Sequence, residues 1–134
     1  MRASAHMTSG TLRSEIDIRG GRFQIGTDEP ESVGGEDTAP APHELLPAAL
    51  ASCVATTLVM YARTKEWDLG DVQVDVNFRQ RETPPRFEVE IALGGDLSEE
   101  QLARLEKVAA SCPVQRSLTA GAVFEERIVT PAAH

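Results

Sequence analysis

Two cysteines are the residues of this 134-residue chain with the clearest chemical potential. Cys53 lies in the middle of "LLPAALASCVATTLVMYA", residues 45–62, a stretch without a charged side chain. Cys112 lies in "SCPVQ", residues 111–115, directly before a proline. A deprotonated thiol is a nucleophile and a metal ligand, so either cysteine could react. The alternative for Cys53 is a small thiol that only packs in the core, because free cysteine is among the most buried residue types.

The local settings of the two thiols differ. A helix is predicted from about Pro42 to Glu66, and it places Cys53 about ten residues from the N-terminus, beyond the reach of the helix dipole. In such an apolar setting the pKa of an isolated thiol rises and the thiol becomes inert. Cys112 is expected at the cap of a short helix that begins with proline, where free backbone N–H groups stabilise a thiolate and Arg116 could add a positive charge. The alternative is that Cys112 only interrupts the chain before the proline.

Glu44 is the acidic residue nearest to Cys53 in the sequence, nine positions before it. On a regular helix nine positions correspond to about 180° of rotation and roughly 13 Å along the axis. Glu44 is therefore not expected to touch Cys53 of its own chain, and a second subunit would have to bring it there. His43 is also one to two turns too distant.

The pattern of the remaining segments predicts an α+β fold with the order β-β-α-β-β-α-α-β. A hairpin is predicted over residues 11–25 with Gly20-Gly21 as its turn, and residues 27–42 read as a loop that is either functional or a solvated connector. Strict alternation predicts an antiparallel pair of strands over residues 72–81 and 86–93. Ser98 and Gln101 form a capping box that starts an amphipathic helix. The segment "AVFEERIV", residues 122–129, is predicted to be a closing strand.

Composition narrows the function classes. The formal net charge of −8 disfavours nucleic acid and anionic membrane surfaces, which both attract clustered Lys and Arg. Residues 45–62 reach only the lower edge of a membrane-spanning length and contain Pro47, so a buried helix is favoured over a membrane span. No secretory signal is recognised at the start, which predicts a cytoplasmic protein. His6, His43 and His134 have no metal-ligand spacing with the cysteines, so no metal is predicted.

The first ten residues are predicted to be a flexible N-terminus or the remnant of a tag, since "MRASAHM" reads partly as a cloning remnant. Residues 11–134 are predicted to form one domain, because their number suits a single core.

Several segments of the sequence together resemble a known family. "PHELLPAALASCVATTLVMYA" followed by "ASCPVQRSL" resembles the OsmC/Ohr family of thiol-dependent peroxidases, and "GTDEPESVGGEDTAPAP" is similar to its entry loop. The resemblance implies an OsmC-like fold in which antiparallel sheets wrap central helices in an intertwined homodimer. It implies that Cys53 attacks an organic hydroperoxide and becomes a sulfenic acid, which Cys112 resolves to a disulfide. A dithiol such as a lipoyl group would then reduce this disulfide, and no cofactor is implied.

The sequence departs from the family pattern in two places. Many members have Glu directly after the proline, where this chain has His43, and Glu44 follows one place later. The family also holds the reactive thiolate with an arginine, for which Arg22 is the first candidate and Arg19 and Arg13 are the others. We expect Glu44 and this arginine to act on Cys53 across a dimer interface, since an adjacent cation lowers the pKa of a thiol.

Two other function classes stay open. In the first, the same dimeric pocket binds a small apolar ligand and the thiols do not turn over. In the second, a Cys53–Cys112 disulfide reshapes the loop of residues 27–42 for a partner, and the protein is a redox sensor.

Overall fold

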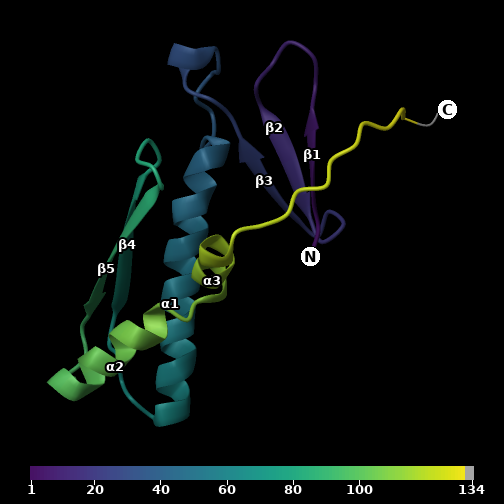
Figure 1. Ribbon diagram of the computed structural model, residues 1–134. Helices are drawn as coiled ribbons and strands as arrows, with labels where there is room; N and C mark the ends of the chain where they lie inside the picture. Colours follow the sequence, from purple (N-terminus) through teal and green to yellow (C-terminus); the bar gives the residue numbers. More distant parts are fainter. Residues whose placement is uncertain (132–134) are drawn as a thin grey trace. The chain divides into compact units, whose positions relative to one another are not determined.

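Figure 1 shows the computed structural model of the protein, which describes residues 1–131. It contains antiparallel strands and helices in the order β1-β2-β3-α1-β4-β5-α2-α3, with two short 3-10 helices, Glu31–Val33 and Pro42–Glu44, before α1. The α+β class is therefore as the sequence predicts. The chain divides into two units, one of Met1–Ser52 with Val74–Glu90 and one of Cys53–Gln73 with the residues from Ile91 onward. The prediction of a single domain from residue 11 stays a prediction.

The first unit begins with a three-stranded antiparallel sheet of β1 (Ala3–Met7), β2 (Ser14–Ile18) and β3 (Phe23–Thr27), in that spatial order. In the β2–β3 hairpin Ile16 pairs with Ile25, and the turn runs through Gly20 and Gly21 as predicted. Both glycines have positive φ angles, 65° and 93°, which explains their place in this turn.

Ala3–Met7 forms strand β1 and pairs with β2 from Ala3↔Ile18 to Met7↔Ser14. The interpretation of residues 1–10 as a flexible N-terminus or the remnant of a tag stays a prediction. The segment has no apolar alternation to reveal it. A two-stranded hairpin is marginal in water, and an added third strand satisfies the backbone groups of an edge whatever its side chains. The pattern of side chains in a sequence does not reveal such backbone hydrogen bonds.

Helix α1 spans Leu45–Lys65 and ends where Glu66 adopts a left-handed φ of 58°. Its fully buried side chains recur every fourth residue and thus form one stripe: Leu50, Val54, Leu58 and Ala62. Other apolar side chains of the helix are exposed, with Met60 at 60%. Within a single chain, the buried helix that the sequence favours is therefore buried along one stripe only.

By length and composition alone, Pro42–Lys65 passes as a membrane span, and 22% of its apolar window is buried. This is weak evidence for a membrane, because the core helix of a soluble protein passes the same test.

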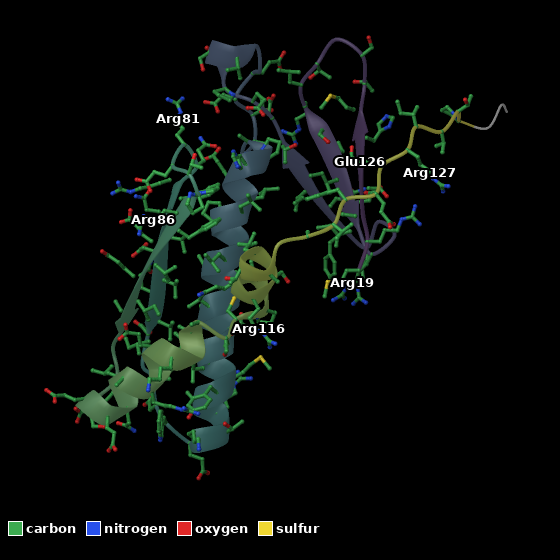
Figure 2. The ribbon with its side chains drawn as sticks, in the orientation of Figure 1. Arg19, Arg81, Arg86, Arg116, Glu126 and Arg127 are labelled. Carbon is green, nitrogen blue, oxygen red and sulfur yellow. The ribbon has the colours of Figure 1, made fainter. Side chains whose placement is uncertain are left out.

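Strands β4 (Val72–Arg79) and β5 (Arg86–Leu93) form the predicted antiparallel hairpin. The side chains of β4 alternate between half-buried and exposed, and Phe78 stacks on Phe87 at a centroid distance of 4.2 Å. Figure 2 shows Arg81 and Arg86 at the turn end of this hairpin. Strand β4 thus has one half-buried face and one exposed face, as strict alternation predicts.

The second unit contains α2 (Glu99–Ala109) and α3 (Pro113–Ala120). The predicted capping box is present, since the Gln101 N–H donates to Ser98 Oγ at 3.1 Å and the Ser98 N–H donates to Gln101 Oε1 at 2.8 Å. The buried side chains of this unit include residues of α1, α2 and the segments that follow them: Val54, Leu58, Ala62, Leu69, Leu105, Ala109 and Cys112. Cys112 is therefore part of a packed core.

The predicted closing strand is absent from the described residues, because residues 121–131 form neither helix nor strand. Figure 1 shows this segment as an extended yellow trace, and Figure 2 labels Glu126 and Arg127 on it. Phe124 and Ile128 are almost fully exposed, at 81% and 102%. Residues with strand propensity become a strand only when an edge offers backbone partners, and within the described part of this chain the segment has none.

Candidate active site

Cys53 and Cys112 meet in the second unit, on α1 and at the start of α3. Cys112 is the N-cap of α3 and Pro113 is its first residue, as the sequence predicts. Cys112 is fully buried, Cys53 is half-buried, and both are free thiols. Three groups near the Cys53 sulfur act on its pKa as hydrogen-bond donors: the Cys112 thiol, the Val114 backbone N–H and the Thr57 hydroxyl.

The pKa of Cys53 is lowered from its ordinary value. Burial by itself acts in the opposite direction, because it penalises the charged form. The hydrogen bonds from the Cys112 thiol, from the Val114 N–H and from Thr57 outweigh that penalty, since all three stabilise the thiolate more than the thiol. Cys53 is thus the member of the pair that ionises more easily.

The pKa of Cys112 is raised. Burial is the largest cause, the hydrogen bond between its thiol and Cys53 is the second, and charge repulsion from Cys53 is the smallest. The N–H groups of Gln115 and Val114 act in the opposite direction but do not prevail. Cys53 is therefore the more easily ionised of the two neighbouring thiols, and disulfide chemistry needs one thiol that ionises and a second one beside it.

The N-terminus of α3 contributes to Cys53 in a way that the sequence did not reveal. Its N–H groups were expected to stabilise Cys112, yet Val114 donates to Cys53 as well. Figure 2 labels Arg116 on α3, but its charge is not among the groups that shift the pKa of either thiol. Thr57 was also missed, although its place four residues after Cys53 is a signal that helical geometry makes available.

The other predicted site residues belong to the first unit. Glu44 Oε1 accepts a hydrogen bond from the Ala41 N–H at 3.0 Å and so stabilises the turn before α1. The guanidinium of Arg22 lies over the Phe23 ring, 5.5 Å from its centroid, and that of Arg19 lies 5.4 Å from the same centroid. The roles of Glu44, Arg22 and Arg19 towards a thiolate stay predictions.

Arg13, the third candidate, binds within its own unit. Its Nε pairs with Glu15 at 3.0 Å, and its Nη1 donates to the carbonyl oxygen and the hydroxyl of Thr38 at 3.2 and 3.0 Å. The guanidinium also lies against Gly26, where an added Cβ would collide with it. Through these contacts the Arg13 side chain links strand β2 to the loop that follows β3.

That loop is anchored by a buried carboxylate, Asp28, which the sequence did not single out. Asp28 Oδ2 accepts hydrogen bonds from the N–H and hydroxyl of Thr38 at 3.1 and 2.6 Å, and its Oδ1 accepts one from the Glu29 N–H at 2.8 Å. These bonds, led by the one from the Thr38 hydroxyl, lower the pKa of Asp28 to about 2, although burial opposes them. The loop expected over residues 27–42 is therefore an ordered segment.

Among residues 1–131 no group of three or more His, Cys, Asp and Glu side chains could hold a metal ion.

An α+β fold that brings two free cysteines together, one with a lowered and one with a raised pKa, defines a candidate thiol-redox protein. Comparison with family models gives a match to the family described as OsmC-like protein over residues 34–127, which is most of the chain. The chain therefore belongs to the OsmC-like family, as the sequence resemblance implies. A search of curated proteins found no match to this sequence.

Solved structures share the fold. One is a Psychrobacter arcticus 273-4 protein whose name refers to osmotic stress and detoxification, with 25% identity, 85% of each chain covered and a TM-score of 0.70. An OsmC-like protein from Mycoplasma pneumoniae has 17% identity over 88% of this chain and 86% of its own, with a TM-score of 0.71. An organic hydroperoxide resistance protein OsmC from Legionella pneumophila has 23% identity over 86% of this chain and 85% of its own, with a TM-score of 0.60. The last two likenesses concern the fold alone.

Proposed function

We propose that this protein is a thiol-dependent peroxidase that reduces organic hydroperoxides with Cys53 and Cys112. The observation that carries the proposal is that the buried, free thiol of Cys112 lies beside the free thiol of Cys53 and helps to lower its pKa. Membership in the OsmC-like family supports it, and proteins named for organic hydroperoxide resistance share the fold. Peroxidase chemistry needs a thiolate that can attack and a second thiol within reach.

In the first step the Cys53 thiolate attacks the distal peroxide oxygen. A sulfur–oxygen bond forms, the O–O bond breaks, and the alkoxide leaves and takes up a proton to become the alcohol. The peroxide is reduced and Cys53 is oxidised to a sulfenic acid. The Cys112 sulfur then attacks the Cys53 sulfur, which releases water and leaves a Cys53–Cys112 disulfide. A dithiol of the lipoyl kind reduces the disulfide and is itself oxidised to a disulfide.

The preference for an organic peroxide rests on the surroundings of Cys53. The thiol is half-buried in a helix that has no charged residue from Leu45 to Ala62. An apolar setting favours an alkyl group, which gains free energy on leaving water, over hydrogen peroxide, which loses hydrogen bonds with water. A cytoplasmic protein with reduced thiols is consistent with this function.

The active form that we propose is a homodimer. Met60 on α1 and Phe124 and Ile128 of the C-terminal segment are exposed apolar side chains, which a second copy of the chain would cover. In this dimer Glu44 and Arg22 of one subunit would act on Cys53 of the other, in keeping with the helical separation of Glu44 and Cys53.

The test is stopped-flow oxidation of the reduced protein by cumene hydroperoxide and by hydrogen peroxide, with Cys53→Ser and Cys112→Ser as variants. We expect fast oxidation by the organic peroxide, no oxidation in Cys53→Ser, and accumulation of the sulfenic acid in Cys112→Ser. Oxidation by both peroxides at the rate of a free thiol would refute the proposal. Fast disulfide formation without turnover under a dithiol would instead indicate a redox sensor.

A further inference from the structure

A small cavity of about 190 Å³ lies in the second unit, where α1 ends and the chain leads into β4. Two of the residues that line it, Arg63 and Asp68, are charged and exposed. Its apolar lining residues are buried or half-buried: Val59, Ala62, Trp67, Leu69 and Val72. An apolar interior with a few charged groups at its edge is typical of a site for a small organic ligand.

Hydrogen bonds hold the wall of the cavity that follows α1. The Trp67 N–H donates to the Ala62 carbonyl oxygen at 2.9 Å, and the Gly95 N–H donates to the Leu69 carbonyl oxygen at 2.7 Å. Gly70 lies in the same wall with a φ of 63°, and a Cβ added to it would collide with the backbone of Gly95. A wall that is fixed in this way exists before a ligand arrives, so binding costs little conformational entropy.

The Trp67 ring is also supported by an aromatic neighbour. It packs edge-on against the Tyr61 ring, with a centroid distance of 5.7 Å and an interplanar angle of 73°. The Tyr61 hydroxyl accepts a hydrogen bond from Arg104 Nε at 3.0 Å, and the Lys65 ammonium lies 5.8 Å from the centroid of the Tyr61 ring. Because Tyr61 is held by these two cations, Trp67 forms a rigid aromatic wall of the cavity.

The two charged residues at the cavity differ in their contacts. Asp68 Oδ1 accepts a hydrogen bond from the Gly70 N–H at 2.9 Å. The guanidinium of Arg63 forms none of the ion pairs found within residues 1–131. A guanidinium matches the geometry of a carboxylate and can bind it with two parallel hydrogen bonds. Arg63 therefore favours an acid as the ligand, and Asp68 makes an amine the competing ligand.

The cavity is separate from the two thiols. Val59 lies six residues after Cys53 on α1, which on a regular helix is about 120° around the axis and about 9 Å along it. Neither cysteine is among the described residues that line the cavity. A ligand in the cavity would therefore bind without contact to the reactive sulfur.

We propose that this cavity binds a small carboxylate with an aryl or short alkyl body, whose carboxylate pairs with Arg63 and whose apolar part lies against Trp67. An apolar cavity of about 150 Å³ accommodates benzene. The larger volume here leaves room for a phenyl ring that carries a short acid group. Burial of the apolar part supplies the affinity, and Arg63 supplies the preference for an acid. The proposal goes beyond the peroxidase function and does not rest on it.

The experiment titrates the protein with phenylacetate and follows the fluorescence of Trp67, the only tryptophan of the chain. The neutral phenylacetamide and the cation phenethylamine are the comparison ligands. Arg63→Gln removes the charge from the cavity, and Val59→Phe fills its volume. The matched control is Lys107→Gln, which removes an exposed positive charge from α2, outside the cavity. Circular dichroism establishes that each variant is folded.

We expect phenylacetate to change the Trp67 fluorescence saturably. Phenylacetamide should bind about tenfold more weakly, since a hydrogen bond to a charged group is worth about one order of magnitude, and phenethylamine should bind more weakly still. Arg63→Gln should weaken the binding of phenylacetate about tenfold and change that of phenylacetamide by less than about twofold. Val59→Phe should weaken both, and Lys107→Gln should change neither.

The absence of a saturable change with phenylacetate in the wild type would overturn the proposal, and so would equal affinities of Arg63→Gln and the wild type. Tighter binding of phenethylamine than of phenylacetate would assign the cavity to cations through Asp68 and would overturn it as well. Full binding of phenylacetate to a folded Val59→Phe would place the ligand outside the cavity and refute the site. If Val59→Phe does not fold, the comparison of Arg63→Gln with Lys107→Gln still decides.

Discussion

Leu58→Ala tests whether the buried stripe of α1 stabilises the unit that holds both thiols. Leu58 has 0% exposure, directly follows Thr57, and belongs to the buried set that includes Cys112. The change removes three buried carbon atoms at about 0.8 kcal/mol each, which gives roughly 2.4 kcal/mol of lost transfer free energy. The cavity that remains adds about 1–2 kcal/mol, because a close-packed core collapses only in part. We therefore expect the free energy of unfolding to fall by about 3–4 kcal/mol.

The assay is equilibrium unfolding in urea, followed by circular dichroism and by the fluorescence of Trp67. All proteins are compared at one concentration, because self-association would make the apparent stability depend on it. Leu102→Ala is the matched control: Leu102 is on α2, 44% exposed, and its truncation should cost less than about 1 kcal/mol. A loss for Leu58→Ala no larger than that of the control would refute the packing that we assign to α1.

Two further predictions concern the loop and the dimer. The pKa of Asp28 is lowered from 3.8 to about 2 in the folded state, so its ionised carboxylate stabilises the fold above about pH 4, and this stabilisation is lost as the pH falls towards 2. We expect Asp28→Asn to lower the Tm at neutral pH and to flatten its pH dependence between 4 and 2, measured by thermal unfolding across that range; an unchanged profile would contradict the assignment. For the dimer, sedimentation velocity should show Met60→Asp shifted towards the monomer and the exposed control Lys107→Asp unchanged, whereas a dimer that tolerates Met60→Asp would exclude this face of α1 from the interface.

The sequence predicts best those elements whose signals are local. The Ser98–Gln101 capping box places the start of α2, because its two hydrogen bonds join residues three apart. Alternation predicts β4 and β5 for a similar reason, since the period of two is a property of each strand. Cys112 before Pro113 likewise identifies the start of α3.

The elements that sequence analysis misplaced depend on partners distant in the chain. Strand β1 forms because β2 offers an open edge, and nothing in Ala3–Met7 reveals that edge. Residues 122–129 have the apolar content of a strand but no partner strand within the described part of the chain. The Asp28 anchor is a similar case, because the hydrogen bonds that lower its pKa come mainly from Thr38, ten residues later.

The pKa of Cys53 also depends on both local and distant parts of the chain. From the sequence alone, a thiol in the middle of an apolar helix should have a raised pKa and be inert. Burial indeed raises the pKa, and the dipole of α1 cannot compensate at this distance from its N-terminus. The compensation comes chiefly from Cys112 and Val114 at the N-terminus of another helix, more than fifty residues later, and the local Thr57 adds to it. The pKa of this thiol is therefore lowered by tertiary structure, so a change that moves α3 away from α1 should raise the pKa of Cys53 without altering the residue itself.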